Sequence, residues 1–301
     1  MLRDAARVAG LLLVVVCLGC TLGGCSGAPG GPAASRPAQT PTAPAPPPAS
    51  PTAPAASASP PATRIGNATA APRWLGTRVL PVGPNGFAAA QKTPPELRDR
   101  SIITVDDLPP PPDGRFHATV QAVPASVLAR SSWSKDCPVA AADLRYLRVS
   151  FRGFDGRAHT GELLVNARAA ADLVTVFRRL FAAGFPIERM RISSATDLNA
   201  PPTGDGNTTE AFACRPVRGD KAWSQHAYGL AVDINPFQNP YHKGKVVLPE
   251  LATAYLDRAP ARPGMVRPSG PVVKAFAAIG WPWGGDYRSL KDYMHFSASG
   301  G

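Results

Sequence analysis

The side chains that could bind a metal ion are few in this chain of 301 residues. Its histidines are His117, His159, His226, His242 and His295. Zinc takes histidine, cysteine and carboxylate ligands, and a catalytic zinc site uses three of them and leaves one position for water. Two stretches, one around His226 and one around His295, bring residues of these types close together in the sequence. A metal-dependent hydrolytic site is therefore one interpretation of the pattern.

The first stretch runs from Ser224 to Asp233 and contains His226 and, seven positions later, Asp233. On one straight strand, residues an odd number of positions apart point to opposite faces. The two side chains can converge only if the backbone turns between them, and Gly229 permits a turn because glycine tolerates a positive φ. A carboxylate among the apolar residues around position 233 is costly unless it is paired or metal-bound. The alternative is a surface turn and a salt-bridged Asp233.

The second stretch is Asp292-Tyr-Met-His295, near the end of the chain. Metal-assisted hydrolysis also needs a carboxylate beside the attacking water as general base, and Asp292 is placed for that role. An Asp-x-x-His pair alone is a weak signal, because such pairs are frequent by chance. His242 is a rival ligand, which we interpret as a loop histidine near the rim of the cleft. His117 and His159 have no evident partner in the sequence and are expected to be structural or exposed.

Together, the two stretches follow the pattern SxHxxGxAxD and then DxxH. This pattern resembles the LAS-type zinc peptidases, which are the D-alanyl-D-alanine carboxypeptidases and L-alanyl-D-glutamate endopeptidases of peptidoglycan. The resemblance implies that one zinc ion is bound by His226, Asp233 and His295, and that Asp292 is the catalytic base. It further implies a zinc peptidase that cleaves peptide bonds next to D-residues in peptidoglycan stem peptides.

The resemblance extends over about 163–296. The tryptophan–glycine segment 280–285 is similar to a loop that precedes the last ligand in the family, and 207–215 is similar to a segment that precedes the first ligand in one branch. The implied fold is α+β, with a central antiparallel sheet flanked by helices, of the hedgehog/D,D-peptidase-like type, and with zinc lying on the sheet.

One feature of the family is missing. Many members carry a substrate-binding arginine in a Ser-Gly-Tyr-Arg segment, whereas 192–197 of this chain contains none. We expect Arg215 to replace it, because a guanidinium can grip a peptide carboxylate through two hydrogen bonds. The alternative is an ordinary surface arginine. Ser224 is expected to bind substrate or a metal ligand, and one arginine does not decide between a carboxypeptidase and an endopeptidase.

The N-terminal residues 1–25 are predicted to be an export signal. Arg3 and Arg7 precede an apolar run at 11–19, which is shorter than the roughly 20 residues that span a bilayer and is typical of a signal peptide. Leu22-Gly-Gly-Cys25 resembles a bacterial lipobox, so Cys25 is expected to carry a lipid. The protein would then be exported and anchored by lipid to the extracytoplasmic face of the cell membrane, in the cell wall. The alternative is a signal that is simply cleaved.

Residues 26–72 are predicted to form a disordered Pro/Ala-rich spacer. Between 26 and 63 the chain has 12 prolines and a single charged residue, Arg36, so it has almost nothing to bury. Its prolines favour an extended, semi-rigid conformation. Residues 73–115 are expected to be a partly ordered extension, and 116–301 the zinc peptidase domain, which is long enough to bury a core.

Cysteine and charge content limit the partners. Cys137 and Cys214 lie outside the signal region, and in an exported protein such a pair favours a disulfide over two free thiols. The net charge of +11 could indicate nucleic-acid binding, but export leaves wall polymers and lipid head groups as the relevant polyanions. We expect a monomer with no nucleic-acid partner.

The expected regular elements are interspersed without βαβ alternation, which favours an α+β fold with a largely antiparallel sheet. Alternating apolar residues predict strands, and apolar residues at helical spacing predict helices. The predicted strands are 147–151, 161–165, 190–192, 212–214, 230–234 and 293–297, and the predicted helices are 167–183 and 271–279.

A second function fits the same ligand pattern. A zinc-stabilised, non-catalytic lipoprotein that binds the cell wall would use the same three ligands. It would have no need of Asp292, so the presence of this residue favours the peptidase.

Overall fold

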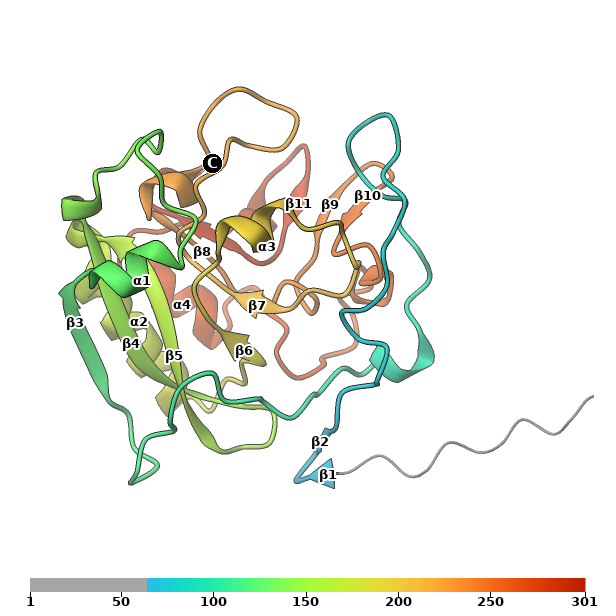
Figure 1. Cartoon of the computed structure of the whole chain (residues 1–301). Coiled ribbons are helices and arrows are strands. Elements are labelled where there is room, and N and C mark those ends of the chain that lie inside the picture. The colour runs from blue at the N-terminus through green and yellow to red at the C-terminus, as the bar shows by residue number, and fades with distance from the viewer. Residues whose placement is uncertain (1–63, 301) are drawn as a thin grey trace, which may run out of the picture. The chain divides into compact units, whose positions relative to one another are not determined.

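The computed structural model describes residues 64–300 and shows a mixed α/β protein with short helices and small, mainly antiparallel sheets (Figure 1). The predicted signal peptide, the predicted lipidation site Cys25 and most of the predicted spacer lie outside the described residues. Among the helices of the described part, none has the length and apolar character needed to cross a membrane.

A three-stranded antiparallel sheet forms one side of the structure. Its central strand β4 (Leu144–Arg152) pairs with β3 (Ala118–Ala122) and β5 (Ala158–Asn166). Alternate residues of β4 belong to different apolar clusters, Leu147 on one side and Tyr146 on the other, so both faces of the sheet are buried. The predicted strands 147–151 and 161–165 are present as a hairpin, and both are longer than expected because their apolar residues continue on both faces.

Helix α2 (Ala170–Ala182) packs on β4 and on α4 (Pro271–Ala277). A 3₁₀ turn (Ala167–Ala169) precedes α2, and the side chain of Asn166 caps that turn. The residues of α2 that the structure buries are Ala170, Leu173, Val176, Phe177 and Leu180. The predicted helix ends as expected, with Gly184 at a φ of 63°.

The remaining strands are short. β8 (Ala231–Asp233) pairs with β12 (His295–Ser297), and β6 (Arg189–Met190) pairs in parallel with β7 (Thr208–Thr209). β9 (Tyr241–Lys243) lies between β10 (Val246–Leu248) and β11 (Lys291–Asp292). The antiparallel strands are thus divided among several small sheets, although an antiparallel bridge between Glu210 and Asp233 connects the end of β7 to β8.

The predicted strand at 212–214 is wrong. Phe212 and Ala213 are buried and Cys214 is half-buried, but all three are irregular. The N–H of Ala213 donates to the carbonyl of His226, and the carbonyl of Ala213 accepts from the N–H of Arg215, so these groups form no strand ladder. A short apolar run fits a buried irregular segment as well as a strand.

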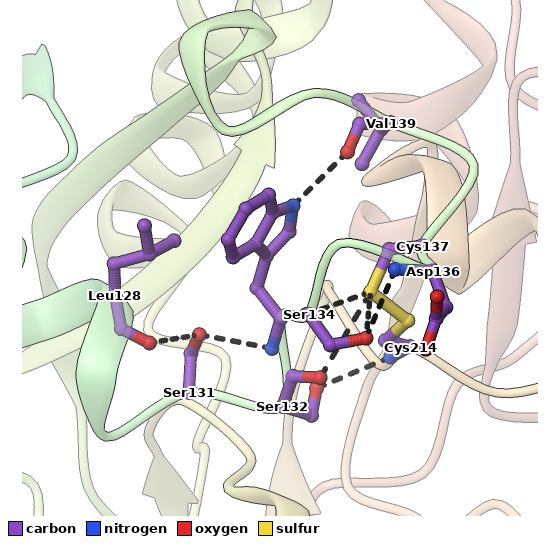
Figure 2. The surroundings of a disulfide bond; sticks show 9 residues. Leu128, Ser131, Ser132, Ser134, Asp136, Cys137, Val139 and Cys214 are labelled. Atoms are coloured by element: carbon purple, nitrogen blue, oxygen red, sulfur yellow. Dashed lines mark hydrogen bonds between the residues drawn. A yellow bond between two sulfur atoms is a disulfide. The ribbon is translucent and has the colours of Figure 1, made fainter.

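A disulfide joins Cys137 to Cys214, with a Cα–Cα distance of 5.7 Å (Figure 2). The disulfide connects Cys214 to the segment that follows α1 (Ala125–Ala129). The backbone N–H of Cys214 also donates to Ser132 Oγ at 3.1 Å. The segment directly before Arg215 is therefore fixed from two sides.

The chain before β3 packs against the C-terminal half. It contains β1 (Arg64–Ile65), β2 (Ala68–Thr69) and a 3₁₀ turn (Pro95–Leu97). Leu97 is fully buried in an apolar cluster with Phe237 and Tyr255. Nearby, Arg100 forms a buried two-pronged ion pair with Glu188 at 2.6 and 2.8 Å. Removing one partner of a buried pair is strongly destabilising, so this contact holds the extension in one position.

Candidate metal centre and active site

His226 lies on a single 3₁₀ turn, Gln225–Tyr228. Ser224 caps the start of this turn, and its Oγ accepts the backbone N–H of His226 at 3.3 Å. Gly229 ends the turn with a φ of 66°, so the turn predicted between His226 and Asp233 is present. A Cβ atom at position 229 would lie 2.6 Å from the backbone nitrogen of Asn166, so both the conformation and the close approach require glycine.

Asp233 and His295 are direct neighbours across the β8–β12 pair. Opposite residues of an antiparallel pair place their side chains on the same face, so the strand register alone brings this carboxylate and this imidazole together. On the other side of β8, the backbone groups of Asp233 exchange two hydrogen bonds with Glu210, at 2.9 and 3.2 Å. Asp233 is thereby fixed on both edges of its strand.

Three candidate ligand atoms converge from these elements. His226 Nε2 lies 3.2 Å from His295 Nδ1 and 3.3 Å from Asp233 Oδ2, and His295 Nδ1 lies 3.1 Å from Asp233 Oδ1. A tetrahedral zinc ion with bonds of about 2.0–2.1 Å separates its ligand atoms by about 3.3 Å. Two imidazole nitrogens and a carboxylate oxygen at this spacing fit a single such ion, so the group could hold a metal.

The orientation of His226 also fits a ligand. Its Nδ1 lies 2.6 Å from the carbonyl oxygen of Ala211, which can only accept a hydrogen bond. Nδ1 therefore carries the proton, and Nε2 presents its lone pair to His295 and Asp233. A backbone carbonyl that fixes the second ring nitrogen is the usual support of a metal-binding histidine.

The electrostatics of the group favour a cation. Burial opposes the charge of Asp233, but the neighbouring His226 and His295 outweigh burial and lower the pKa of this carboxyl below its usual range. Burial likewise opposes protonation of His226, yet the charge of Asp233 raises the pKa of this imidazole. The carboxylate thus attracts positive charge into the site, as a proton or as a metal ion.

Asp292 lies on β11, three residues before His295. Its Oδ1 atom is buried and has no hydrogen-bond partner in the part of the chain that the structure describes. Burial and, second, the charge of Asp233 raise the pKa of Asp292 to about 7. A buried carboxylate oxygen without a partner is costly, so this atom is suited to a partner that exchanges, such as water or substrate.

Arg215 and Ser224 form the base of the hairpin 215–224, where the N–H of Ser224 donates to the carbonyl of Arg215. Arg215 is half-buried, and its guanidinium donates to the carbonyl of Pro216 at 3.3 Å. Its charge acts on both Asp292 and His226, which places it close to the candidate metal group. The hydroxyl of Ser224 serves the turn that carries His226.

His242 and Asp197 lie outside this group. His242 is on β9, and its Nε2 contacts the carbonyl oxygen of Gly244. Asp197 accepts two hydrogen bonds from Arg191, both at 2.8 Å, and completes a capping box at the start of α3 (Ala195–Asn199).

His117 and His159 both have partners. His117 is exposed and pairs with Asp113 at 2.8 Å. His159 is buried, with Asp106 2.8 Å from its Nδ1 and Asp155 3.0 Å from its Nε2. The expectation that these two histidines are structural or exposed is confirmed: His117 lies on the surface, and His159 is buried between two carboxyl groups.

Sequence reasoning missed Glu210. Its side chain accepts a hydrogen bond from Ser193 Oγ, and its charge acts on His226. The available signal was a lone carboxylate next to the apolar run 211–213, the same kind of signal that pointed to Asp233. Tyr241 was also missed; it lies opposite Asp292 across the β9–β11 pair, and nothing in the spacing of the sequence indicates this pairing.

Comparison with known proteins identifies a family over part of the chain. Residues 218–298 match a family model described as D-alanyl-D-alanine carboxypeptidase. The matched segment contains the three candidate ligands and Asp292, whereas Arg215 lies outside it. No solved structure matches the chain. Over this segment the chain is similar to D-alanyl-D-alanine carboxypeptidases, which confirms its resemblance to the LAS-type zinc peptidases.

Proposed function

We propose that the protein is a zinc-dependent peptidase that hydrolyses bonds next to D-residues in peptidoglycan stem peptides, as a D,D-carboxypeptidase or an L-Ala-D-Glu endopeptidase. The observation that carries the proposal is the convergence of three metal-ligand atoms beside a carboxylate oxygen that lacks a partner among the described residues. The family match supports the choice of peptide and substrate class.

One zinc ion would be held by His226 Nε2, His295 Nδ1 and a carboxylate oxygen of Asp233. When bound at such ligands, zinc lowers the pKa of water to about 7 and polarises a carbonyl group. Asp233 supplies the negative charge, and Ala211 holds the ring of His226 in the required orientation.

Asp292 acts as the base in this proposal. Its unpartnered Oδ1 accepts the proton of the attacking water, and the resulting carboxylic acid returns a proton to the leaving amine. A group that both accepts and donates a proton works best when its pKa lies near the working pH. The raised pKa of Asp292, about 7 in the absence of a metal ion, supports this double role.

Arg215 would bind a carboxylate of the peptide. Its guanidinium donates to a single backbone carbonyl, so most of its N–H groups are available to substrate. A terminal carboxylate is what a carboxypeptidase binds, whereas the substrate of an endopeptidase would present the free carboxylate of its D-glutamate. The hydroxyl of Ser224 caps the turn that carries His226. Ser224 would therefore position His226 as a metal ligand, and it would also contact the substrate.

The site of action follows from the N-terminal sequence. We place the protein outside the cytoplasm, anchored to the membrane through a lipid on Cys25 and held away from it by residues 26–63, the part of the predicted spacer that precedes β1. The peptidase domain would then act as a monomer in the wall. The apolar run at 11–19 and the lipobox-like Leu22-Gly-Gly-Cys25 support this placement.

The alternative is a zinc-stabilised module that binds the cell wall without cleaving it. Asp292 argues against this alternative. A module that only binds would gain nothing from a carboxylate that burial keeps without a partner, since this arrangement costs stability.

Incubation with purified muropeptides, followed by mass spectrometry, distinguishes these functions. A carboxypeptidase releases one terminal D-alanine, and an endopeptidase separates the stem after its first L-alanine. Asp292→Asn should retain zinc and lose cleavage by at least about a hundredfold. Muropeptides that are retained but unchanged in mass by the wild-type protein would favour the binding module, and full activity of Asp292→Asn would remove Asp292 as the base.

A further inference from the structure

A pocket lies where the N-terminal extension meets the body of the protein. Its volume is about 350 Å³, and it is lined by 82–88 of the extension, by residues at the end of α3, by Arg218 and by Glu250. The extension is fixed here by two backbone hydrogen bonds, from Leu80 to Pro202 at 2.8 Å and from Gln91 to Glu250 at 2.9 Å. The pocket is therefore built by two distant parts of the chain.

Glu250 provides an unpaired acidic group inside the pocket. The residue is 3% exposed, and its Oε1 has no hydrogen-bond partner within residues 64–300. Burial raises the pKa of this carboxyl, which shows that its charge is poorly compensated. A buried carboxyl group of this kind is normally paired or bound to a ligand.

Arg218 provides an unpaired basic group at the edge of the same pocket. It is exposed near the tip of the hairpin 215–224, and it forms no hydrogen bond or ion pair with any described residue. Its charge acts on Glu250, yet the two side chains do not form a salt bridge in the structure. The pocket thus offers one anionic and one cationic group with space between them.

Both walls of the pocket lead to the candidate metal group. The hairpin that carries Arg218 ends at Ser224, which caps the turn of His226. Helix α3 begins two residues after Ser193, whose hydroxyl donates to Glu210. Glu210 acts electrostatically on both Arg218 and His226. The pocket and the candidate metal group are thus connected through the hairpin 215–224 and through Glu210.

We propose that this pocket is a substrate subsite for a side chain that ends in an ammonium and a carboxylate on the same carbon atom. The ammonium binds Glu250, and the carboxylate binds Arg218. This inference rests on the proposed function for its substrate, a peptide, but not for the pocket itself. A volume of about 350 Å³ lies at the lower end of small-molecule sites and suits one such side chain.

Binding of three blocked amino acids to the full chain tests the subsite. The probes are Nα-acetyl amides of norleucine, lysine and 2,6-diaminoheptanedioic acid, the last with its second ammonium and carboxylate free. Calorimetric titrations are performed with and without a chelator, so that binding to an active-site metal is recognised. We expect the doubly charged probe to bind at least about tenfold more tightly than norleucine, with lysine between them, because each charged contact strengthens binding.

The variants assign the two contacts. Glu250→Gln should remove the preference for lysine over norleucine and should weaken binding of the doubly charged probe, because the ammonium contact is lost. Arg218→Gln should bring the doubly charged probe to the affinity of lysine, and Arg218→Glu should weaken it further. Arg98→Gln is the matched control, because Arg98 is also exposed and its side chain has no partner in the described structure. Unfolding temperatures verify that each variant is folded. If Glu250→Gln does not fold, the Arg218 variants still test the subsite, because Arg218 is exposed and its replacement should leave the fold intact.

Equal affinities of all three probes for the wild-type protein would overturn the subsite. So would a preference for the doubly charged probe over lysine that survives in the Arg218 variants, or a preference for lysine over norleucine that survives in folded Glu250→Gln. Hydrolysis of stem peptides separates this failure from that of the proposed function. A protein that cleaves but shows no probe preference retains the function without the subsite. A protein that binds the probes selectively but cleaves nothing retains the subsite without the function.

Discussion

His226 Nε2 lies 3.2 Å from His295 Nδ1, although 69 positions separate the two residues. Their rings meet edge to face, with centroids 5.1 Å apart. One imidazole comes from a turn and the other from a strand, so the pair forms only when both elements are in place. The metal-binding group is therefore a product of the tertiary structure, and binding a metal there should stabilise the fold.

The first prediction concerns metal content. His295→Ala should lose most of the bound zinc, because only two of the three ligand atoms remain. His242→Ala should retain the wild-type stoichiometry, since His242 lies on β9 outside the group. Elemental analysis of the purified variants measures both. Unchanged zinc content in His295→Ala would discard this ligand assignment.

The second prediction concerns the pH dependence of stability in the metal-free protein. The folded-state pKa of Asp292, about 7, lies above its usual value of 3.8, so folding favours the protonated form. Ionising Asp292 in the folded protein lowers the free energy of unfolding. This loss is absent below about pH 4 and grows as the pH rises to 7. Asp292→Asn should therefore be more stable than the wild type at pH 8, by an amount on the order of a few kcal/mol, and equal to it at pH 4.

Asp197 gives the control of opposite sign. Hydrogen bonds from Arg191 lower its pKa below 3.8, so its contribution is present at neutral pH and is lost as the pH falls through its folded-state pKa. Asp197→Asn should be less stable at pH 7, by about 1 kcal/mol, and this difference should shrink in acid. Chemical unfolding across this pH range measures both variants, and a stability loss at pH 8 in metal-free Asp292→Asn would contradict the assignment.

The third prediction concerns Gly229. Alanine at this position must adopt a positive φ and place its Cβ 2.6 Å from the backbone of Asn166. We expect a loss of about 2–5 kcal/mol, with weaker metal binding, because the turn that carries His226 must move. Gly184→Ala is the control: its φ is 63°, but its Cβ would meet no atom within 4 Å, so it should lose only about 1–2 kcal/mol. Thermal unfolding compares the two, and equal losses would show that the close approach to β5 is unimportant.

The fourth prediction concerns the disulfide. Cys137 and Cys214 are 77 positions apart, and a cross-link of this span stabilises a protein by about 2–5 kcal/mol. The double variant Cys137→Ser/Cys214→Ser should lose about this much stability. The double variant should also bind substrate less well, because Cys214 directly precedes Arg215 and the disulfide fixes that part of the backbone. Unfolding curves and KM measure the two effects. If KM is unchanged while stability falls, the disulfide does not position Arg215 for binding.

Local patterns predicted the parts of the site that depend on neighbouring residues. The turn at Gly229 followed from the odd spacing of His226 and Asp233, and α2 followed from its apolar spacing, because both patterns are short in range. The pairing of Asp233 with His295 came from the family resemblance alone. Spacing carries no information on it, since it depends on strand register between segments that are 62 positions apart.

Other features could not be predicted because they depend on contacts between distant segments. The run at 212–214 has the composition of a strand, but its backbone bonds and the disulfide hold it in an irregular conformation. The pocket that contains Glu250 and Arg218 requires the extension to fold back on the body. Neither charge has a distinctive neighbour in the sequence, so no pattern indicated that they face the same space.

Reconstitution with metal tests the central claim most directly. The protein is freed of metal, titrated with zinc, and supplied with a stem pentapeptide whose products are identified by mass spectrometry. The account predicts no cleavage without metal and a rate that rises to a plateau at one zinc per chain, with wild-type metal binding but no cleavage in Asp292→Asn. Stoichiometric zinc binding by the wild-type protein without cleavage of any stem peptide would contradict it.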